Sequence, residues 1–458
     1  MTKNMNRRSF ISQTSAASLS FLGLQRYLSA APSERVFHPY GKLQADPKGI
    51  LDLPEHFTYH IISKSGERMD DGYRVPGKPD GMAAFPGKNC RIILVRNHEL
   101  HCDKTKHSPF KNAKSPDATL KQAAYDFGSN KNTPPHIGGT TNIIYNPQTQ
   151  KAEKQFLSLT GTDRNCAGGV MPWGSWITCE EPEDLTSQRG RLHGYCFEVK
   201  ASDDGKLQKA IPLKGLGRFC HEAVALDPTT GILYLTEDVN NGLLYRYIPN
   251  TPRDFQNGKL QALAIKNTPQ ADTRNYPQTT NTLQQGATLE VEWIDLENTN
   301  APDNDLRIRG HQAGAAIFAR GEGIIYEKGI IYICCTDGGP LRQGQIFILT
   351  PSPTKDSPDT LELFLQPQAS DLLTNGDNLC SAPWGDLIIC EDLIAEHANK
   401  RPHIRGITPE GQIYTLARNA KDNSEFAGSC FSPDGQTLFV NMQGLGLTLA
   451  ITPKTWKK

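Results

Sequence analysis

The sequence lacks an excess of charge of either sign. Its 458 residues contain 49 Lys and Arg and 49 Asp and Glu, so that the formal net charge is zero. Proteins that bind nucleic acid or an anionic membrane surface typically carry a basic surplus, and we therefore expect neither partner. The mean hydropathy is −0.50, and no hydrophobic stretch is long enough to span a bilayer. These features predict a soluble mature chain without a membrane span.

The eleven cysteines include no Cys-x-x-Cys pair, which argues against a structural zinc site. In an oxidising compartment the default expectation is disulfides, with one cysteine left over. Cys179 and Cys390 each precede a glutamate on a strand-like segment, where neighbouring side chains face opposite ways. We therefore expect these two cysteines to be small buried side chains. Cys166 differs, because it lies in a Gly-rich turn.

The first 31 residues have the features of an export signal. Arg7 and Arg8 precede a short apolar run over residues 16–24, and small residues follow as a cleavage site. Paired arginines in this position resemble a twin-arginine signal, with a Sec signal as the alternative. We expect twin-arginine export of the folded chain. The export machinery is then a partner, and residues 32–458 become periplasmic or secreted.

Glycine and proline are abundant, with 40 and 31 residues, and they separate short strand-like segments. One unit recurs, with a polar opening residue, a short strand, a turn, a second apolar strand and a polar or acidic closing residue. The stretch from Pro79 to Asn97 is a candidate further copy. Opening and closing residues lie 13 to 15 positions apart: Cys166 with Glu180, Glu222 with Glu237, Glu322 with Asp337, Asn378 with Glu391, and Phe426-Ala427 with Asn441.

Self-similarity on the scale of a hairpin is typical of a β-propeller. We predict an all-β fold in which residues 32–458 form one propeller domain of about six blades, with five or seven as neighbouring possibilities. A pair of β-sandwiches is the alternative, and it fits less well because the acidic closing residue recurs on the same element of each unit. Two polar stretches, 103–135 and 253–310, are expected to be long loop insertions, although Leu289 to Ile294 in the second could be a strand or a short helix.

The recurring carboxylates indicate bound cations. Like charges gathered on one axis repel each other, and they lose water only if something compensates them. Hard oxygens suit Ca²⁺ or Mg²⁺, and a carboxylate set that includes one thiolate also admits iron. The alternative is that each acid caps an exposed loop, which explains single residues better than the repeated set. The candidate oxygen donors are Glu180, Glu237, Asp238, Glu322, Asp337 and Glu391.

Two arginines could each form either an internal salt bridge or a contact with phosphate. Arg320 lies two residues before Glu322, and it can form an internal salt bridge or bind a phosphate oxygen with its planar fork. Arg218 has the same choice, and a structural role is favoured there. His98 and His221 each precede a glutamate, so that on a strand they face away from it. We expect them to support ligands or the core rather than to bind metal.

The repeated units contain long blocks in a fixed order. They are Arg96-Asn97-His98-Glu99, Asn165-Cys166-Ala167-Gly168-Gly169, Pro172-Trp173-Gly174-Ser175-Trp176, Thr178-Cys179-Glu180-Glu181, Arg218-Phe219-Cys220-His221-Glu222, Thr236-Glu237-Asp238, Arg320-Gly321-Glu322-Gly323, Cys390-Glu391-Asp392, and Phe426-Ala427-Gly428 with Phe431-Ser432-Pro433-Asp434-Gly435. These blocks resemble the PhoX-type alkaline phosphatases. The resemblance extends from about Pro54 to Ile451, which is nearly all of the mature chain.

The resemblance implies a six-bladed propeller, exported by the twin-arginine route, with a mixed iron and calcium cluster in its channel. By position, Cys166 would bind iron as Fe³⁺. Arg320 would hold phosphate, with Arg218 as a second substrate-binding candidate, and Arg320 and Glu322 would be the catalytic residues. The carboxylate ligands carried over in this way are Glu180, Glu222, Glu237, Glu322 and Glu391.

The function implied by the resemblance is an exported, metal-dependent phosphomonoesterase. It would release phosphate from small organic phosphate esters and act as a monomer. Two alternatives come from other classes. A calcium-dependent lactonase or esterase would use the acidic channel without iron, but a calcium-only site has no use for the Cys166 thiolate. A non-catalytic metal-binding propeller would use the polar stretches 103–135 and 253–310 to bind another protein.

Overall fold

The computed structural model describes residues 37–128, 134–182, 185, 191–278, 283–354, 357–369, 372–394, 397 and 399–456. The predicted signal over residues 1–31 lies outside these described ranges, and so does the part of the first predicted insertion at 129–133. The all-β prediction is confirmed for the described chain. Its helices are short, namely α2 (Ala118–Ala123), α3 (Leu306–Gln312) and the 3₁₀ turns η1 (Lys88–Cys90), η2 (Thr105–His107) and η3 (Lys214–Leu216).

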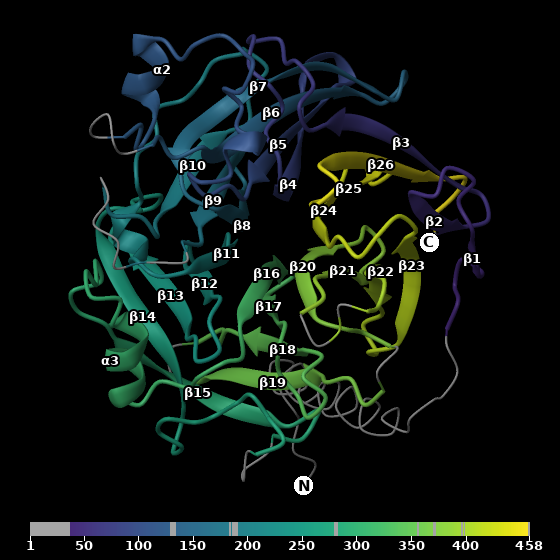
Figure 1. Cartoon of the computed structure of the whole chain (residues 1–458). Helices are drawn as coiled ribbons and strands as arrows, with labels where there is room; N and C mark the ends of the chain where they lie inside the picture. The colour runs from purple at the N-terminus through teal and green to yellow at the C-terminus, as the bar shows by residue number, and fades with distance from the viewer. Residues whose placement is uncertain are drawn as a thin grey trace, which may run out of the picture.

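Five antiparallel sheets surround a central axis (Figure 1). Three of them are small: β4 (Pro79–Pro86), β5 (Ile92–His98), β6 (Gly138–Asn146) and β7 (Lys151–Thr162); β8 (Asn165–Met171), β9 (Ser175–Glu180) and β10 (Cys196–Lys200); and β24 (Phe426–Phe431), β25 (Leu438–Met442), β26 (Leu447–Pro453) and β3 (Phe57–Lys64).

The other two sheets are larger. One has six strands in the order β20 (Gly376–Ser381), β21 (Leu387–Glu391), β22 (His403–Ile407), β23 (Ile413–Asn419), β2 (Leu51–Pro54) and β1 (Leu43–Gln44). The other has nine strands in the order β11 (His221–Leu226), β12 (Leu233–Glu237), β13 (Leu244–Pro249), β14 (Gly258–Ile265), β15 (Thr288–Asp295), β19 (Asp359–Leu365), β18 (Gln345–Thr350), β17 (Ile330–Cys335) and β16 (Gly321–Glu327).

The nine-stranded sheet corrects the prediction of six separate blades. Four sheets are single blades of a propeller-like arrangement, but β15 pairs with β14 on one side and with β19 on the other. It thereby joins two four-stranded groups into one sheet, which curls until its end strands β11 and β16 lie beside each other. The stretch 253–310, expected to be a loop insertion, therefore contains β14, β15 and the start of α3. Its alternation was hard to detect, because Val291 is the one fully buried residue of β15.

Early and late strands of the described chain pair in two of the sheets, which closes the ring. The early strand β3 pairs with the late strand β26, in a register that joins Phe57 to Pro453 and Lys64 to Leu447. The early strand β2 likewise pairs with β23 through Leu51 and Asn419. These pairings join the first strands of the fold to its last strands by backbone hydrogen bonds, and they hold the ring of sheets closed.

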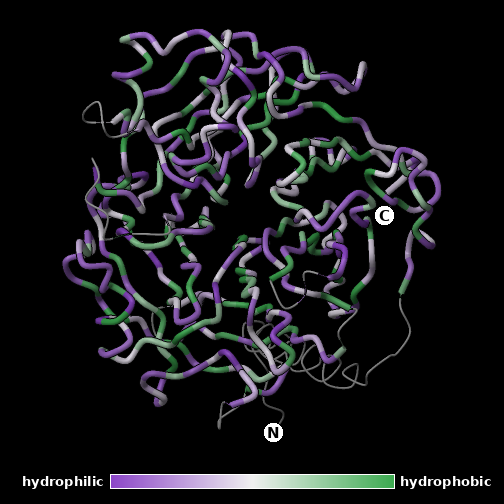
Figure 2. Tube along the Cα trace, in the orientation of Figure 1, coloured by the Kyte–Doolittle hydropathy of each residue, from purple (hydrophilic) through white to green (hydrophobic). Residues whose placement is uncertain are grey.

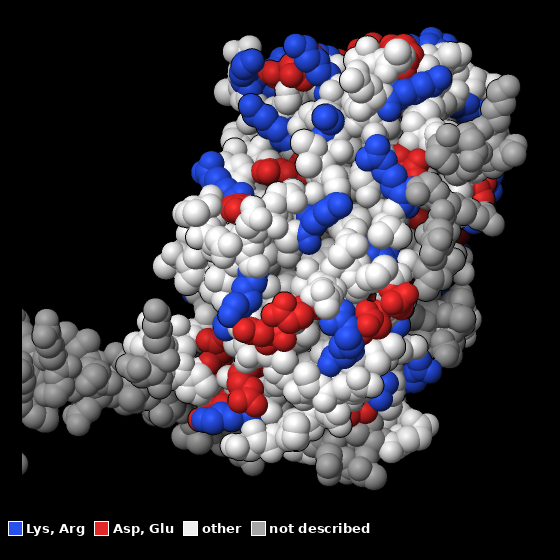
Figure 3. Space-filling view, turned by 90° about the vertical axis from the view of Figure 1, so that its left-hand side faces the viewer, with Lys and Arg blue, Asp and Glu red and all other residues white. Residues whose placement is uncertain are grey.

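Apolar side chains fill the space between neighbouring sheets. Val95 of β5 and Phe197 of β10, for example, belong to one buried cluster that links the first two sheets. Figure 2 shows hydrophobic stretches along the strands and hydrophilic ones in many of the outer connections. Figure 3 shows positive and negative side chains intermixed on one outer face, in keeping with the zero net charge.

All eleven cysteines lie in the described residues and none of them forms a disulfide in this structure, so the default expectation of disulfides is wrong here. Cys179 and Cys196 face each other across β9 and β10, with their sulfur atoms 3.5 Å apart. Cys179 and Cys390 are fully buried, as expected from the sequence. Among the described residues, none of the helices is both long and apolar enough to cross a membrane.

Candidate metal centre in the central channel

The strand nearest the axis in each unit contains a β-bulge close to its start. In β4, Pro79 pairs with His98, and the next pairing joins Met82 to Arg96, so that the inner strand carries one extra residue. The same shift occurs in β8, β11, β16, β20 and β24. A bulge leaves its residues out of the ladder and re-aims their side chains. The residues at these bulges include Asp80, Cys166, Glu222, Glu322 and Asp377.

Small residues allow the bulged strands to approach each other. A side chain at Gly81 would come within 2.7 Å of the backbone oxygen of Cys166, and one at Gly428 within 2.2 Å of the backbone oxygen of Asp80. The Asn97 amide adds a specific contact, because it donates to the carbonyl oxygens of both Cys166 and Ala167. The bulge that carries Cys166 is therefore held from the neighbouring sheet.

The re-aimed side chains meet residues that follow the second strands. Cys166, Glu181 and Glu222 form one group that could hold a metal ion, with ligand atoms within 4.8 Å of one another. Three further groups of the same kind are linked to it in a chain through the shared residues Glu222, Asp377 and Glu425. All four groups therefore form one continuous set. We call this set the channel cluster, and its members are Asp80, Glu99, Cys166, Glu181, Glu222, Glu322, Asp377, Asp392 and Glu425.

Glu222 lies at the centre of the channel cluster and is fully buried. Neither of its carboxylate oxygens has a nitrogen or hydroxyl donor among the described residues. Burial, and then the charges of Glu322 and Glu181, raise the pKa of Glu222 well above its ordinary value. The Cys166 thiol is the one side-chain donor that lowers this pKa. A buried carboxylate with so little compensation is costly, and a cation is the partner that would remove this cost. The site therefore fits a bound metal.

Other members of the cluster have the same electrostatic character. Burial comes first and neighbouring carboxylates second in raising the pKa of Asp80, Glu322 and Asp377 well above the ordinary values. Burial and the charge of Asp80 likewise raise the pKa of the Cys166 thiol. A thiol in such surroundings stays protonated, and a metal ion is what would favour its thiolate.

The structure separates the two acids of each consecutive pair. Glu180 is the last paired residue of β9, and it accepts hydrogen bonds from the backbone amides of Asp163, Gly194 and Tyr195 at 2.9, 2.8 and 3.1 Å. It also contacts Nδ1 of His193 at 2.7 Å. Its oxygens are thus occupied away from the channel, whereas Glu181 belongs to the cluster. Consecutive residues at a strand end face opposite sides.

Glu237 and Glu391 repeat this arrangement. Glu237 accepts from the Tyr245 hydroxyl at 2.7 Å and from a backbone amide, and Glu391 accepts from Arg405 at 2.8 Å and from two backbone amides. The structure brings neither into the channel cluster. Asp337 is likewise engaged elsewhere, by Tyr276 and Arg342. Of the predicted ligands, the cluster contains Cys166, Glu222 and Glu322.

Arg320 lies next to the channel cluster. Its Nε and Nη2 atoms donate to Asp238 at 2.8 Å each, and Nη2 also donates to Glu322 at 3.0 Å. Burial alone would lower the pKa of Arg320, but Glu322 and Asp238 raise it, so that the guanidinium stays charged. A quarter of the side chain is exposed. An anion can therefore reach a cation that is already held in place.

Arg164 was missed by the sequence analysis. Its Nη2 atom contacts Glu181 at 3.0 Å and also Glu99, and its side chain is 23% exposed. Its backbone φ is +46°, and that of Arg320 is +54°. The sequence could have revealed Arg164 by its position, because Arg164 and Arg320 each directly precede the first residue of an inner strand. Lys78 has the same place before β4 and the same backbone conformation, with φ at +47°.

Arg218 has the structural environment that the sequence favoured over substrate binding, although its partners are backbone carbonyls rather than an acid. It is fully buried and donates to four backbone carbonyls, those of Leu185, His193, Asn300 and Ala301. The guanidinium ties three segments of chain together and is not directed at the channel cluster.

His98 and His221 are also buried outside the cluster. Both rings contact backbone carbonyls, those of Gly77 and Gly217. Burial lowers the pKa of His221 to about 4. A supporting role, as expected from the sequence, agrees with these contacts.

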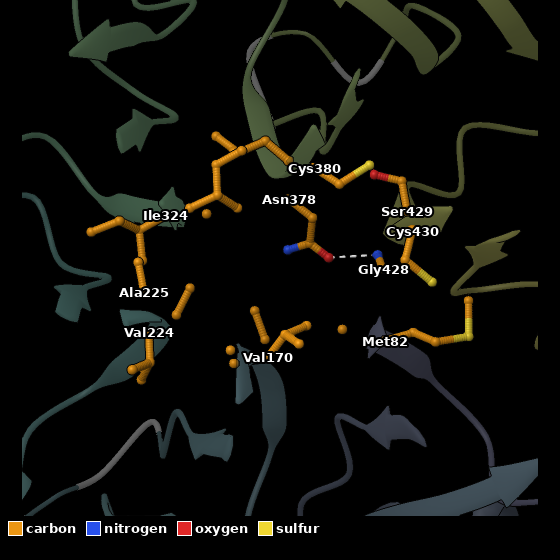
Figure 4. A pocket seen from close by; sticks show the side chains of 18 of the residues that line it. Met82, Val170, Val224, Ala225, Ile324, Asn378, Cys380, Gly428, Ser429 and Cys430 are labelled. Carbon is orange, nitrogen blue, oxygen red and sulfur yellow. Dashed lines mark hydrogen bonds between the residues drawn. The ribbon is translucent and has the colours of Figure 1, made fainter. Parts of the chain in front are cut away.

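A cavity of about 260 Å³ follows the cluster along the same inner strands. Figure 4 shows its wall, in which Met82, Val170, Val224 and Ile324 are apolar. The Asn378 side chain accepts a hydrogen bond from the amide of Gly428 at 2.6 Å, and the lining contains no charged residue. Charged groups therefore gather at the cluster rather than along the whole channel.

Comparisons with known proteins were consistent with one family. The family model described as alkaline phosphatase PhoX matches residues 38–446. PhoX from Pseudomonas fluorescens, solved in complex with vanadate, has a TM-score of 0.63 at 17% identity and covers 92% of this chain and 98% of its own. At this identity the likeness shows a shared propeller-like fold. No curated protein matches the sequence.

Two gluconolactonases have weaker likenesses. XC5397 from Xanthomonas campestris gives a TM-score of 0.41 at 10% identity, covering 92% of this chain and 100% of its own. Periplasmic PpgL from Pseudomonas aeruginosa gives 0.39 at 11% identity, covering 87% of this chain and 96% of its own. Both TM-scores are too low to support a shared activity.

Proposed function

This chain belongs to the PhoX family of alkaline phosphatases, and from that premise we propose that it is a metal-dependent phosphomonoesterase. The observation that carries the proposal is the channel cluster, in which the Glu222 carboxylate, with no nitrogen or hydroxyl donor among the described residues, lies among acids and one thiol. Two partly exposed arginines, Arg164 and Arg320, border it. Buried acids beside accessible cations suit a site that binds metal ions together with a phosphate ester.

Iron and calcium are the proposed metals. Cys166, Glu181 and Glu222 combine one sulfur with carboxylate oxygens, a donor set that suits iron. The remaining groups offer oxygen alone, as in Glu222, Glu322 and Asp377, and oxygen donors suit calcium. When bound, the cations supply positive charge that neutralises the phosphate oxygens. We assign the ligand roles to Glu181 and Asp392 rather than to Glu180 and Glu391, whose oxygens accept hydrogen bonds elsewhere.

The arginines would bind and orient the ester. A guanidinium presents two parallel N–H groups that match two phosphate oxygens. Arg320 is held by Asp238 and Glu322, so that little freedom is lost when it engages the substrate. Arg164 is held in the same way by Glu99 and Glu181. Glu322 is proposed as catalytic because it contacts Arg320 and also belongs to the group of Glu222 and Asp377, linking phosphate to metal.

Export is a separate part of the proposal. We infer that residues 1–31 direct the folded chain to the twin-arginine machinery and that residues 32–458 act in the periplasm or outside the cell as a monomer. Changing Arg7 and Arg8 together to lysine should retain the protein in the cytoplasm. Unchanged export of that variant would favour a Sec signal.

The activity is tested with the natively exported chain and p-nitrophenyl phosphate at alkaline pH. Hydrolysis is expected, chelators should abolish it, and vanadate, the transition-state analogue bound by the Pseudomonas fluorescens protein, should inhibit it. Glu222→Gln should be inactive while Glu237→Gln, a matched change of an acid outside the cluster, stays active when folded. Metal-loaded protein that hydrolyses lactones but no phosphate ester would overturn the proposal in favour of a lactonase.

A further inference from the structure

Four buried side chains meet at a place separate from the channel cluster. Asp126 follows α2, His136 precedes β6, Asp163 lies between β7 and β8, and His193 precedes β10. Each is at most 8% exposed. Ligand atoms of Asp126, His136 and His193 lie within 4.8 Å of one another. Nδ1 of His136 is 3.4 Å from Oδ1 of Asp163, and Nε2 of His193 is 3.8 Å from Oδ2 of Asp126.

Three polar atoms of this group have no hydrogen-bond partner among the described residues. They are Nδ1 of His136, Nε2 of His193 and Oδ1 of Asp163. The two imidazole rings are stacked, with centroids 4.0 Å apart. Buried polar atoms are normally paired. Two of the three unpaired atoms belong to residues of the group Asp126, His136 and His193, and the third lies 3.4 Å from Nδ1 of His136, which indicates a missing partner that accepts lone pairs. A metal ion is such a partner.

The surrounding contacts orient the lone pairs inward. Nδ1 of His193 lies 2.7 Å from Glu180, which already accepts hydrogen bonds from three backbone amides. In the neutral ring Nδ1–H donates to that carboxylate, so that Nε2 carries a lone pair toward Asp126. A carboxylate, a histidine and a metal in this order are a common arrangement around protein-bound zinc. Asp126 is fixed independently by the backbone amides of Gly128 and Arg191, at 2.8 Å each.

We propose that Asp126, His136, Asp163 and His193 form a second metal site that binds zinc. Two imidazole nitrogens with two carboxylates are a donor set that zinc accepts in a tetrahedral arrangement. Donor atoms around such an ion lie about 3.3 Å apart, close to the 3.4 and 3.8 Å observed. The missing Cys-x-x-Cys pair argued against zinc, but this site uses no cysteine and gathers its ligands from distant positions of the chain.

The competing explanation is an ion-pair network without metal. Burial alone would lower the pKa of His193, but the carboxylates of Glu180 and Asp126 raise it to about 10. An imidazolium could then bridge these two acids. The 3.8 Å separation from Asp126 is too long for a direct hydrogen bond, and that bridge leaves Nδ1 of His136 unpaired. The experiment below distinguishes the two.

The site lies beside two residues of the channel cluster's border. Asp163 precedes Arg164, which contacts Glu99 and Glu181, and His193 contacts Glu180, which precedes Glu181. An ion bound here would fix the chain on both sides of Arg164 and Glu181. Its role is positioning, and zinc binding itself does not depend on the proposed phosphatase activity.

The test measures zinc in the full exported chain and in four variants. Wild-type protein should retain one zinc per chain after dialysis, and His136→Ala and His193→Gln should lose it. His101→Ala is the matched control, because His101 lies next to His136 with a ring separation of 6.2 Å but belongs to the surface. It should keep its zinc. Glu222→Gln should also keep zinc while losing phosphatase activity, which separates this proposal from the proposed function.

Cobalt substitution keeps the proposal testable if the histidine variants do not fold. Co²⁺ bound at this site should give visible absorption of tetrahedral strength without a sulfur charge-transfer band. Wild-type protein with no zinc and no such spectrum would overturn the proposal. So would folded His136→Ala and His193→Gln proteins that contain as much zinc as the wild type.

Discussion

Arg320 donates two hydrogen bonds to Asp238, from Nε and Nη2 at 2.8 Å each, across 82 positions of the sequence. Arg320 holds a left-handed backbone with φ at +54°, a conformation that is costly for a residue with a side chain and is found at functional sites. Asp238 therefore fixes the direction of a guanidinium that remains partly exposed. The pairing is the arrangement expected of a preorganised anion-binding group.

Replacing Arg320 should reduce phosphate ester turnover. We expect Arg320→Ala to lower kcat/KM for p-nitrophenyl phosphate on the order of 100-fold, the loss typical of one preorganised charge-stabilising donor. Asp238→Asn should lower it less and mainly by raising KM, because Glu322 still contacts Arg320. Steady-state kinetics on both variants checks this. Equal kinetics for Arg320→Ala and wild type would exclude Arg320 from substrate binding.

Replacing Arg218 should lower stability instead. Arg218→Met leaves four backbone carbonyls without their buried donor, which we expect to cost about 3 kcal/mol or more in the free energy of unfolding. Chemical denaturation measures the loss. KM of the folded fraction should stay unchanged. An unaltered unfolding free energy with a raised KM would restore the sequence-based prediction that Arg218 binds substrate.

Replacing Glu391 should lower stability, whereas replacing the adjacent Asp392 should lower metal affinity. Glu391→Gln weakens the buried pair with Arg405 and is expected to cost about 3–5 kcal/mol in the free energy of unfolding. Asp392→Asn removes one of the repelling carboxylates of the channel cluster, so that the metal-free protein should keep its stability while metal affinity falls about 10-fold or more. Thermal unfolding and metal titration measure the two effects. A reversed result would return the ligand role to Glu391.

Chelation should destabilise the protein more as the pH rises. Burial and mutual repulsion raise the pKa of Glu222 and Glu322 above their ordinary value of 4.5 in the metal-free fold. A group whose folded pKa is raised contributes stability below its unfolded pKa and loses that contribution as the pH rises through the folded pKa. The free energy of unfolding of the metal-free protein should therefore fall as the pH rises above about 4.5. Bound metal should reduce this loss, because its positive charge compensates the carboxylates.

The measurement is the difference in Tm between metal-loaded and chelated protein across a pH series. The difference should be small in acid and widest in alkaline buffer. Glu222→Gln, which removes the central charge, should flatten this dependence. A Tm difference that is constant with pH would show that the channel acids are not the groups that the metals neutralise.

The sequence predicted the propeller-like fold, the inner strands and three members of the channel cluster, because repeated residues at fixed spacing carry that information. It missed Glu181 by one position. Glu180 and Glu181 are both acidic and adjacent, and only the register of β9 against β8 decides which one faces the channel. The bulges that re-aim Cys166 and Glu222 leave no trace in the spacing of the repeats.

Other features were hidden for different reasons. Only one residue of the strand β15 is buried, so that hydrophobic alternation could not reveal how it joins two groups of strands. Arg164 could have been found from its place before β8, which matches that of Arg320 before β16. His136 and His193 come from unrelated stretches of chain, and only the folded structure brings their rings together.

The most direct test of the central claim is anomalous X-ray diffraction at the iron edge from crystals of the natively exported protein. The account predicts an iron peak within bonding distance of the Cys166 sulfur and of carboxylate oxygens from Glu181 and Glu222. An active enzyme whose crystals show no iron beside Cys166 would contradict it.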